Sequence, residues 1–370
     1  MIDIYLDNDM ACADVQDYLT RSNVKFTHVE KWDFSPAREK DLHNLPEEIF
    51  SSQDTAVVMA QANFFHILSD DAYRARIHQY ISRGNHMLVT GLAQGGIDSY
   101  YTWDYADPWI VDALKDLDHN LGNGSLTLYL DAQPMREHWL LQDLKNVKFM
   151  DVIHMRYWFP TIRGGRTVKK DCTHDFLLLT VYRDMEKSRH RKYLMDQLRS
   201  RPGLMDRGMV NYTTQDSKYD QWVGGTFKDD PWPDASPSMS LYLDSWMEVV
   251  PETMYARGHY VTEKTIKPMA TRTPFLVCST QGYLRYLQSQ GYRTFGGLIN
   301  ERYDQEPDLA TRISKMLDQL QDIVRNGAES FYRASQDILE HNQLKLAENH
   351  GMMNIRTGHQ VQGWLDRING

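Results

Sequence analysis

A threonine, a glutamate and a lysine stand together at residues 262–264, and a second lysine follows at Lys267. If Thr262 caps a helix, Glu263 and Lys264 lie in its first turn, beside free backbone N–H groups and the positive end of the helix dipole. Anionic groups bind readily at such a position. A carboxylate there can accept both hydroxyls of a ribose, and the lysines can neutralise a diphosphate. These residues predict half of a nucleotide-sugar site, although an ordinary surface turn has the same composition.

Three aspartates could take the proton of an attacking hydroxyl, which is the task of a general base in glycosyl transfer. Asp7 follows the first apolar run of the chain, Asp98 follows a pair of glycines, and Asp131 ends another apolar run. Active sites of α/β folds lie at the carboxyl ends of strands, so each aspartate is a candidate catalytic residue. Among the histidines, His66 and His86 are the alternatives.

The run Asp7-Asn8-Asp9 fits two further uses. Paired aspartates can hold a divalent metal on a nucleotide sugar in another transferase fold, but there they follow several strands. An apolar strand ending in two aspartates also resembles the opening motif of haloacid-dehalogenase-type phosphatases, which would use Asp7 and Asp9. Those enzymes have Thr or Val two residues after the second aspartate, where this chain has Ala11. A coincidental acidic loop is the simpler interpretation.

Short apolar runs alternate with helical patterns through the first 160 residues, which predicts a largely parallel, doubly wound sheet. The expected strands are residues 2–6, 24–29, 56–59, 87–90, 126–130 and 147–153, and the expected helices are 13–21, 71–83 and 109–118. Residues 155–173 are rich in glycine, proline and charge, and we interpret them as a connection between two domains.

The same alternation restarts after this connection, with an expected strand at 176–181 and a helix at 187–199. A long loop is expected at 215–239. Residues 241–250 predict either a short strand leading into a helix or a helix throughout.

The segment 260–304 predicts a buried strand, an amphipathic helix closed by Gly291, and a second short strand. Asp308 is the expected N-cap of the following helix, because apolar residues then recur at helical spacing. The tail from residue 330 is predicted to be helical and broken near Gly351 and Gly358.

The composition sets limits on the class of protein. A chain of 370 residues is long enough for two domains, and it contains no apolar run of 18 residues that would predict a membrane-spanning helix. Its three cysteines are widely spaced without a CxxC pair, which favours a reducing compartment, the cytoplasm, over a disulfide framework or a zinc site.

The charge is unevenly distributed, although the net charge is −9. Residues 1–150 carry 12 lysines and arginines against 23 acidic residues, whereas residues 151–210 carry 13 against 7. A basic band after an acidic lobe suits a partner with phosphates, and a solvated helix face is the alternative.

Together these elements predict an α/β fold of two Rossmann-like lobes in the GT-B glycosyltransferase architecture. Residues 1–160 would form an acceptor-side lobe and residues 174–329 a nucleotide-sugar lobe. The helical tail, residues 330–370, would cross back and pack on the first lobe.

The segment 260–304 resembles a family of glycosyltransferases found in large phages and giant viruses. It is also similar to fucosyltransferase-like enzymes, in which a Thr-Glu-Lys sequence opens the helix that meets the nucleotide sugar. The resemblance covers roughly residues 175–325 and includes basic positions at Arg183, His190 and Arg191. The matching residues are Thr262, Glu263, Lys264, Lys267, Pro268, Pro274, Phe275, Gly282, Leu284, Leu287, Gly291, Thr294, Phe295, Tyr303 and Asp304.

The resemblance implies that Glu263 holds the ribose, while Arg183 with Lys264 or Lys267 holds the diphosphate. These positive charges would stabilise the departing nucleotide, so no cofactor or metal is expected beyond the donor, for which a UDP-sugar is favoured. Glu248 and Glu252, just upstream, could face the sugar, or could be exposed acids.

The phage-like resemblance and the basic band favour hydroxymethylated bases of double-stranded DNA as the acceptor. Contacts to DNA phosphates would come from Arg163, Arg166, Lys169 and Lys170, with the modified base flipped out of the duplex. The overall acidity favours the competing acceptor, a glycan or a protein. A phosphatase, or a catalytically silent structural protein, is the further alternative, and no membrane partner is expected.

Overall fold

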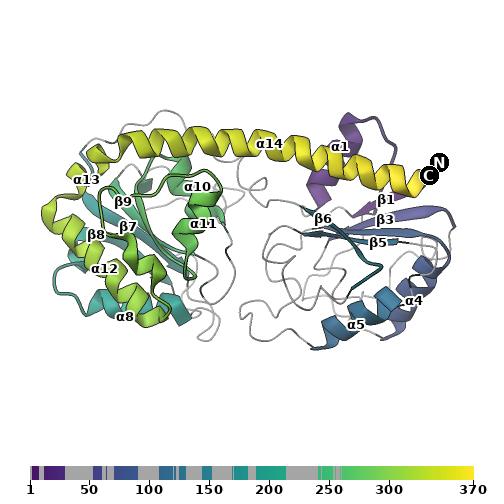
Figure 1. The fold of residues 1–370 in the computed structure, drawn as a ribbon, viewed down its shortest axis with the longest axis horizontal. Coiled ribbons are helices and arrows are strands. Elements are labelled where there is room, and N and C mark those ends of the chain that lie inside the picture. The colour runs from purple at the N-terminus through teal and green to yellow at the C-terminus, as the bar shows by residue number, and fades with distance from the viewer. Residues whose placement is uncertain are drawn as a thin grey trace. The chain divides into compact units, whose positions relative to one another are not determined.

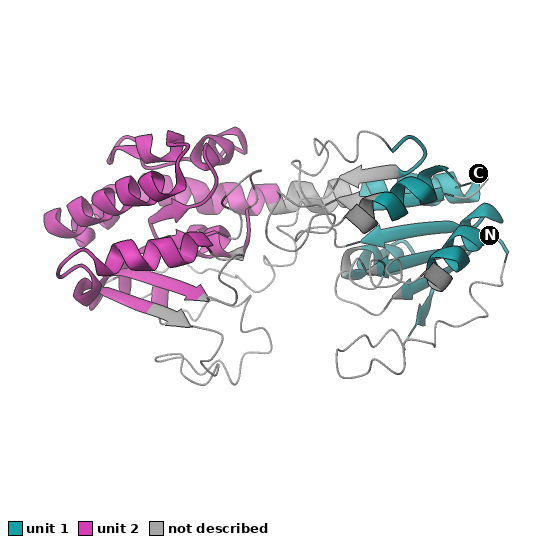
Figure 2. Ribbon diagram, turned by 90° about the horizontal axis from the view of Figure 1, so that it is seen from below, with its two compact units in different colours: residues 1–154, 353–370 teal, residues 155–352 magenta. Residues whose placement is uncertain are grey.

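The computed structural model describes two α/β units. The described residues are 2–7, 12–29, 53–60, 64, 71–90, 108–119, 121, 125–130, 144–151, 169, 171–181, 189–213, 241–242, 244–252, 255, 259 and 261–370. Unit 1 comprises residues 1–154 and 353–370, and unit 2 comprises residues 155–352 (Figure 2). The predicted tail is therefore divided between the units, and the connection at 155–173 is assigned to unit 2.

Unit 1 is built on a six-stranded parallel sheet of order β2-β1-β3-β4-β5-β6 (Figure 1). Its strands are β1 Asp3–Asp7, β2 Thr27–Val29, β3 Thr55–Ala60, β4 His86–Thr90, β5 Ser125–Leu130 and β6 Lys148–Asp151. The helices described in this unit before the tail are α1 Ala13–Arg21, α4 Asp71–Ser82 and α5 Pro108–His119. The chain winds from β1 to β2 in one direction and from β3 to β6 in the other, so right-handed crossovers place α1 opposite to α4 and α5.

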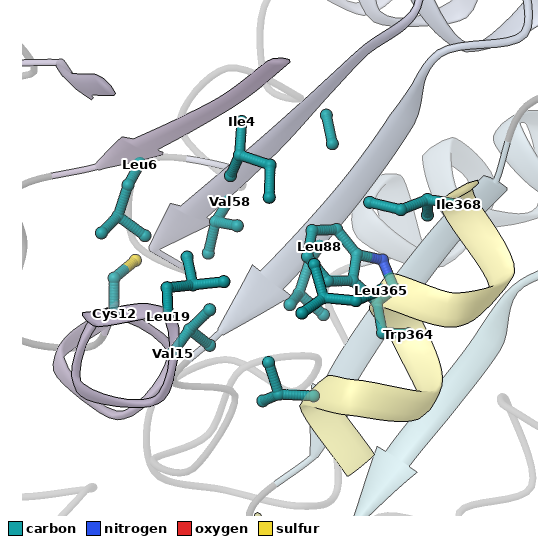
Figure 3. Packing of buried hydrophobic residues seen from close by; sticks show 12 residues of the cluster. Ile4, Leu6, Cys12, Val15, Leu19, Val58, Leu88, Trp364, Leu365 and Ile368 are labelled. Carbon is teal, nitrogen blue, oxygen red and sulfur yellow. The ribbon is translucent and has the colours of Figure 1, made fainter. Parts of the chain in front are cut away.

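On the α1 face of this sheet, the end of the C-terminal helix packs over β3 and β4. Ala56, Val58 and Leu88 point to this face and share a buried cluster with Trp364 and Leu365 of α14 Gln336–Asn369 (Figure 3). The neighbouring Thr55 points to the other face, where its hydroxyl lies 2.9 Å from the Tyr80 hydroxyl of α4. Burial of this large aromatic side chain therefore ties the chain terminus to the first unit.

The helix α14 runs through both glycines at which a break was predicted, so that prediction is wrong. At Gly358 a Cβ atom would lie 3.1 Å from the ring of Tyr18, and the Tyr18 hydroxyl donates to Gln362 at 2.7 Å. The glycine therefore permits close approach of two helices rather than ending one. Earlier in the same helix, Asn342 bonds both the N–H and the C=O of Arg293 in unit 2.

Unit 2 is built on a four-stranded parallel sheet of order β10-β9-β7-β8. The strands are β7 His174–Val181, β8 Gly208–Thr213, β9 Ser245–Pro251 and β10 Phe275–Cys278. The helices are α8 Arg189–Arg199, α10 Glu263–Ala270, α11 Tyr283–Ser289, α12 Leu309–Asn326 and α13 Ala328–Ala334, with 3-10 turns η4 Met205–Arg207 and η7 Glu301–Gln305. Every residue of β9 is buried, as expected for a central parallel strand covered on both faces.

The predicted α/β fold of two doubly wound lobes is confirmed, and most predicted elements lie within a few residues of the observed ones. Asp308 caps α12 by accepting from the Thr311 N–H, as predicted. One local prediction is wrong, because the residues after Gly291 form no strand. Strand and helix were both left open for residues 241–250, and the structure has a strand at Ser245–Pro251. The predicted loop at 215–239 lies outside the described residues. Within the described residues, no helix is long and apolar enough to cross a membrane.

Candidate nucleotide site at the carboxyl edge of the second sheet

The order of strands in unit 2 identifies the place where a ligand would bind. From β7 the chain moves outward to β8, then returns across β7 to β9 and continues to β10. Ligands of open parallel sheets bind at the carboxyl ends of strands beside such a reversal, here between β7 and β9. Right-handed crossovers place α8 and α10 on opposite faces, with the start of each helix at this edge.

The start of α10 is organised by a buried carboxylate at the end of β9. Oε1 of Glu252 accepts from the Thr262 N–H at 2.9 Å, the Thr265 hydroxyl at 2.8 Å and the Tyr283 hydroxyl at 3.2 Å. Oε2 accepts from the Thr262 hydroxyl at 2.5 Å. Thr262 in turn caps α10, because its side chain accepts from the Lys264 N–H at 3.3 Å.

Glu252 is fully buried, so it matches neither alternative left open by the sequence, a carboxylate facing the sugar or an exposed acid. Its two oxygens are occupied by four donors from α10 and α11, which satisfies a charge that would otherwise be costly to bury. Tyr283 and Thr265 were not identified from the sequence. The only local signal was the spacing of Thr262 and Thr265, which places both hydroxyls on the first turn of the helix.

A buried histidine lies at this edge, close to several charged side chains. His190, at the start of α8, is buried, and its Nε2 lies 2.7 Å from the backbone oxygen of Glu252. Burial lowers the pKa of His190 well below its usual value, and the nearby charges of Arg191, Lys264 and Arg312 act in the same direction. The imidazole is therefore neutral near pH 7, so it is not one of the cations that the resemblance implied. Three cationic side chains therefore lie near this ring.

Arg312 is the structural cation of this group. Its guanidinium donates to the backbone oxygens of Ser279 at 3.1 Å, Glu306 at 2.5 Å, Pro307 at 3.3 Å and Tyr255 at 3.2 Å. The side chain therefore joins α12 to the segments that follow β9 and β10. The Tyr255 ring stacks on His190 with centroids 4.6 Å apart.

An aromatic pair lies at the neighbouring strand end. The half-buried His259 ring stacks on Tyr286 of α11 with centroids 5.2 Å apart, and its Nδ1 lies 2.9 Å from the Thr280 hydroxyl. Gly282, in the left-handed conformation at φ 80°, lets α11 begin directly beneath this ring. The pair adds a flat, partly apolar surface to the same edge of the sheet.

The structure brings together the predicted donor-binding residues that it describes on α10. Thr262 is the N-cap, Glu263 is the first helical residue, and the half-buried Lys264 and Lys267 follow. The side chain of Glu263 lies outside the description. Asp7 ends β1 at the strand reversal of the first sheet, and its side chain is likewise not described. The remaining predicted residues outside the described part are Asp9, Asp98, Asp131, Arg163, Arg166, Lys170 and Arg183.

His86, an alternative base, lies at the wrong edge of its sheet. It begins β4, and its Nδ1 lies 2.8 Å from the hydroxyl of Ser125, the first residue of β5. This is the amino edge of the parallel strands, away from the carboxyl edge where α/β active sites form. His66 lies outside the described residues.

Lys169 is not available for the DNA contact that was predicted for it. The residue is buried, with an exposed fraction of 3%, and its ammonium group donates to the backbone oxygen of Ser245. Nζ also lies 5.9 Å from the centre of the Tyr332 ring, and burial lowers the pKa of Lys169 to about 8. The sequence placed this lysine in a basic run, whereas the fold places it beneath α13.

Glu248 is not a donor-binding residue on this geometry, because its carboxyl lies inside the unit. It is buried within β9, and Oε1 accepts from the Tyr242 hydroxyl at 3.3 Å. Burial raises the pKa of Glu248 to about 8, although the charges of Lys267 and Lys169 act in the opposite direction. A carboxyl that keeps its proton to this pH is neutral in the folded protein under ordinary conditions.

We expect Glu248→Gln to change how the stability of unit 2 depends on pH. Between pH 4.5 and about 8 the unfolded chain has lost the Glu248 proton, whereas the folded chain retains it. Raising the pH through this window therefore lowers the free energy of unfolding, by at most about 1.4 kcal/mol per pH unit. The amide resembles the protonated carboxyl but does not titrate. Urea unfolding from pH 5 to 8 should show the wild type losing stability relative to Glu248→Gln, and a constant difference would contradict the assignment.

An open groove of about 1070 Å³ lies elsewhere on unit 2. It is formed by the loop 296–302, the second half of α12 and α13, and contains none of the predicted site residues. Its size alone does not mark it as the reaction site. Among the described residues, no group of three or more His, Cys, Asp or Glu side chains is arranged to hold a metal ion.

Fold and site together define an α/β protein of two doubly wound parallel units, with a basic site at the carboxyl edge of the second sheet. No family model and no curated protein matches the chain.

Several solved structures are similar in fold. T4 phage BGT in complex with its UDP-glucose substrate matches at 9% identity and TM-score 0.43, over 100% of both chains. The DNA modifying enzyme β-glucosyltransferase matches at 10% identity and TM-score 0.40, over 96% of this chain and 99% of that one. The GtfA/B complex matches at 10% identity and TM-score 0.45, over 87% of this chain and 59% of that one. Similarities at this level carry no argument about substrate or activity.

Proposed function

We propose that the protein is a glycosyltransferase that moves a sugar from a nucleoside diphosphate, UDP by preference, to an acceptor hydroxyl. The observation that carries this proposal is the convergence of cations on the carboxyl edge of the second sheet. There, Arg191, Lys264 and Arg312 act on the buried His190 at the strand reversal between β7 and β9. A diphosphate is the anion whose charge and size suit such an edge.

In this proposal Glu263 accepts the ribose hydroxyls, and Lys264, Lys267 and Arg183 hold the diphosphate. As the bond between the anomeric carbon and the diphosphate oxygen breaks, negative charge develops on that oxygen. The cations and the N–H groups at the start of α10 stabilise this charge without a metal ion. The bond from the acceptor oxygen to the anomeric carbon forms in the same step, and the acceptor proton passes to Asp7, Asp98 or Asp131.

We expect UDP to raise the melting temperature of unit 2 without added divalent metal, and Glu263→Ala to abolish this increase. A ribose that loses its two hydroxyl contacts binds more weakly, by roughly 10- to 100-fold. Calorimetry with UDP, GDP and their sugars would measure the effect. Glu329→Ala is a matched control, since Glu329 also lies in the first turn of a helix, α13, and should leave the UDP response unchanged.

Two other outcomes identify the competing functions. Stabilisation that requires Mg²⁺ and disappears with Asp7→Ala would favour a phosphatase. No stabilisation by any nucleotide would favour a structural protein.

The proposed acceptor is a hydroxymethylated base of double-stranded DNA, and a glycan or a protein is the alternative. Salt-dependent binding of duplex DNA, weakened when Arg163, Arg166 and Lys170 are replaced by Glu, is the expected result for DNA. Lys169 is left out of this set because it is buried. Binding that is absent or independent of salt would remove DNA, and mass spectrometry of candidate glycans and proteins would then identify the acceptor.

A further inference from the structure

The first turn of α10 is attached to the sheet through one side chain. Four of the hydrogen bonds to the Glu252 carboxylate come from donors outside β9, three of them on Thr262 and Thr265 at the start of α10. The fourth comes from Tyr283 of α11. The backbone N–H of Glu252 donates to the Cys278 oxygen of β10 at 3.0 Å. The side chain therefore joins the carboxyl edge of the sheet to two helix starts.

The orientation of Thr262 depends on this carboxylate. The Thr262 hydroxyl donates its proton to Oε2 of Glu252. A lone pair of the hydroxyl oxygen is then left to accept from the Lys264 N–H. The Thr262 N–H is directed to Oε1. With both groups held, the backbone of Thr262 is extended at φ −104° and ψ −179°, and the next residue enters the helix. The cap therefore fixes the backbone position at which residues 263 and 264 enter the first turn of α10.

We infer that Glu252 is a positioning residue for the nucleotide site: it does not touch the donor, but holds the turn that carries Glu263 and Lys264. The identity of the ligand in this inference rests on the proposed function. The positioning of α10 rests only on the hydrogen bonds of Glu252. Because the carboxylate is fully buried, its effect on a ligand passes through Thr262 and α10. In Glu252→Gln the negative charge is lost and the four donors compete for one amide oxygen. The amide N–H group is then directed at the Thr262 hydroxyl.

The test compares two glutamates of similar chemistry in the same unit. Glu301 also bonds a threonine hydroxyl and a backbone N–H, those of Thr294 at 2.7 Å and Phe295 at 2.6 Å, but it lies on η7 at the separate groove. We expect Glu252→Gln to weaken UDP binding at least tenfold by calorimetric titration at a temperature where the variant is folded. Glu301→Gln should lower the melting temperature to a similar extent without changing the affinity for UDP.

Hydrogen exchange of the ligand-free protein separates failure of this inference from failure of the proposed function. Glu252→Gln should speed exchange at residues 263–266 more than at β7 or α12, and Glu301→Gln should not. If the wild type binds no nucleotide but this exchange pattern is observed, the function fails and the positioning role stands. If Glu252→Gln leaves both the exchange of α10 and the affinity at wild-type values, the inference is overturned. It is also overturned if Glu252→Gln and Glu301→Gln lose the same stability and the same affinity for UDP.

Discussion

Trp364→Ala is expected to destabilise unit 1 by about 3–5 kcal/mol, because it removes a fully buried indole from the cluster around β3 and β4. The loss is large because Trp364 heads the fully buried side chains by volume and belongs to the cluster that packs on β3 and β4. The unfolding transition of unit 1 should move to lower temperature in calorimetry, and amide exchange of β1, β3 and β4 should accelerate. The sheet of unit 2 should retain its protection, since Trp364 belongs to the other unit.

Leu344→Ala is the matched control on the same helix. Leu344 has an exposed fraction of 64%, so its truncation should change the free energy of unfolding by no more than about 0.5 kcal/mol. Equal effects of the two substitutions would show that general helix stability, rather than the docking of the terminus on the sheet, governs unit 1.

Arg312→Met is expected to destabilise unit 2 by about 3–5 kcal/mol. Methionine keeps most of the side-chain volume, but the backbone oxygens of Ser279, Glu306, Pro307 and Tyr255 lose their shared donor. Urea unfolding followed on unit 2 would measure the effect.

The control for this change lies at the other end of α12, in its last turn. Arg325 is exposed and pairs with Asp322 one turn earlier, so Arg325→Met should cost less than about 0.5 kcal/mol. A small effect of Arg312→Met, comparable with this control, would contradict the role of Arg312 as the donor that joins α12 to the site.

Much of the fold was predictable because the relevant information is local. The strands of unit 1 are short apolar runs that end at polar or glycine-rich residues, and burial on both faces of a parallel sheet requires such runs. The cap at Asp308 was recognisable from its residue type and the apolar spacing that follows. Strand and helix stayed open for residues 241–250 because a strand buried on both faces has no alternation to distinguish it from a helix.

The helix start at Thr262 was predictable, but its tertiary contacts were not. Thr262 and Lys264 were recognised because capping and dipole effects act within one helical turn. The sequence could not show that Glu252 would take up the hydroxyl of Thr262 or that Lys169 would lie beneath α13, since both depend on residues far along the chain. Gly358 was read as a break because its partner, Tyr18, is more than three hundred residues away.

From its sequence alone, this chain determined which segments become strands and helices, and where the helix capped by Thr262 begins. Hydrophobic periodicity and capping are properties of neighbouring residues, so they can be read without a structure. The tertiary structure decided which acidic side chains stay at the surface. It buried Glu248 of β9 as a neutral group, and it buried Glu252, just after β9, as an acceptor of four hydrogen bonds. Burial and hydrogen-bond partners arise only when distant segments pack together, and they set the chemistry of an ionisable side chain.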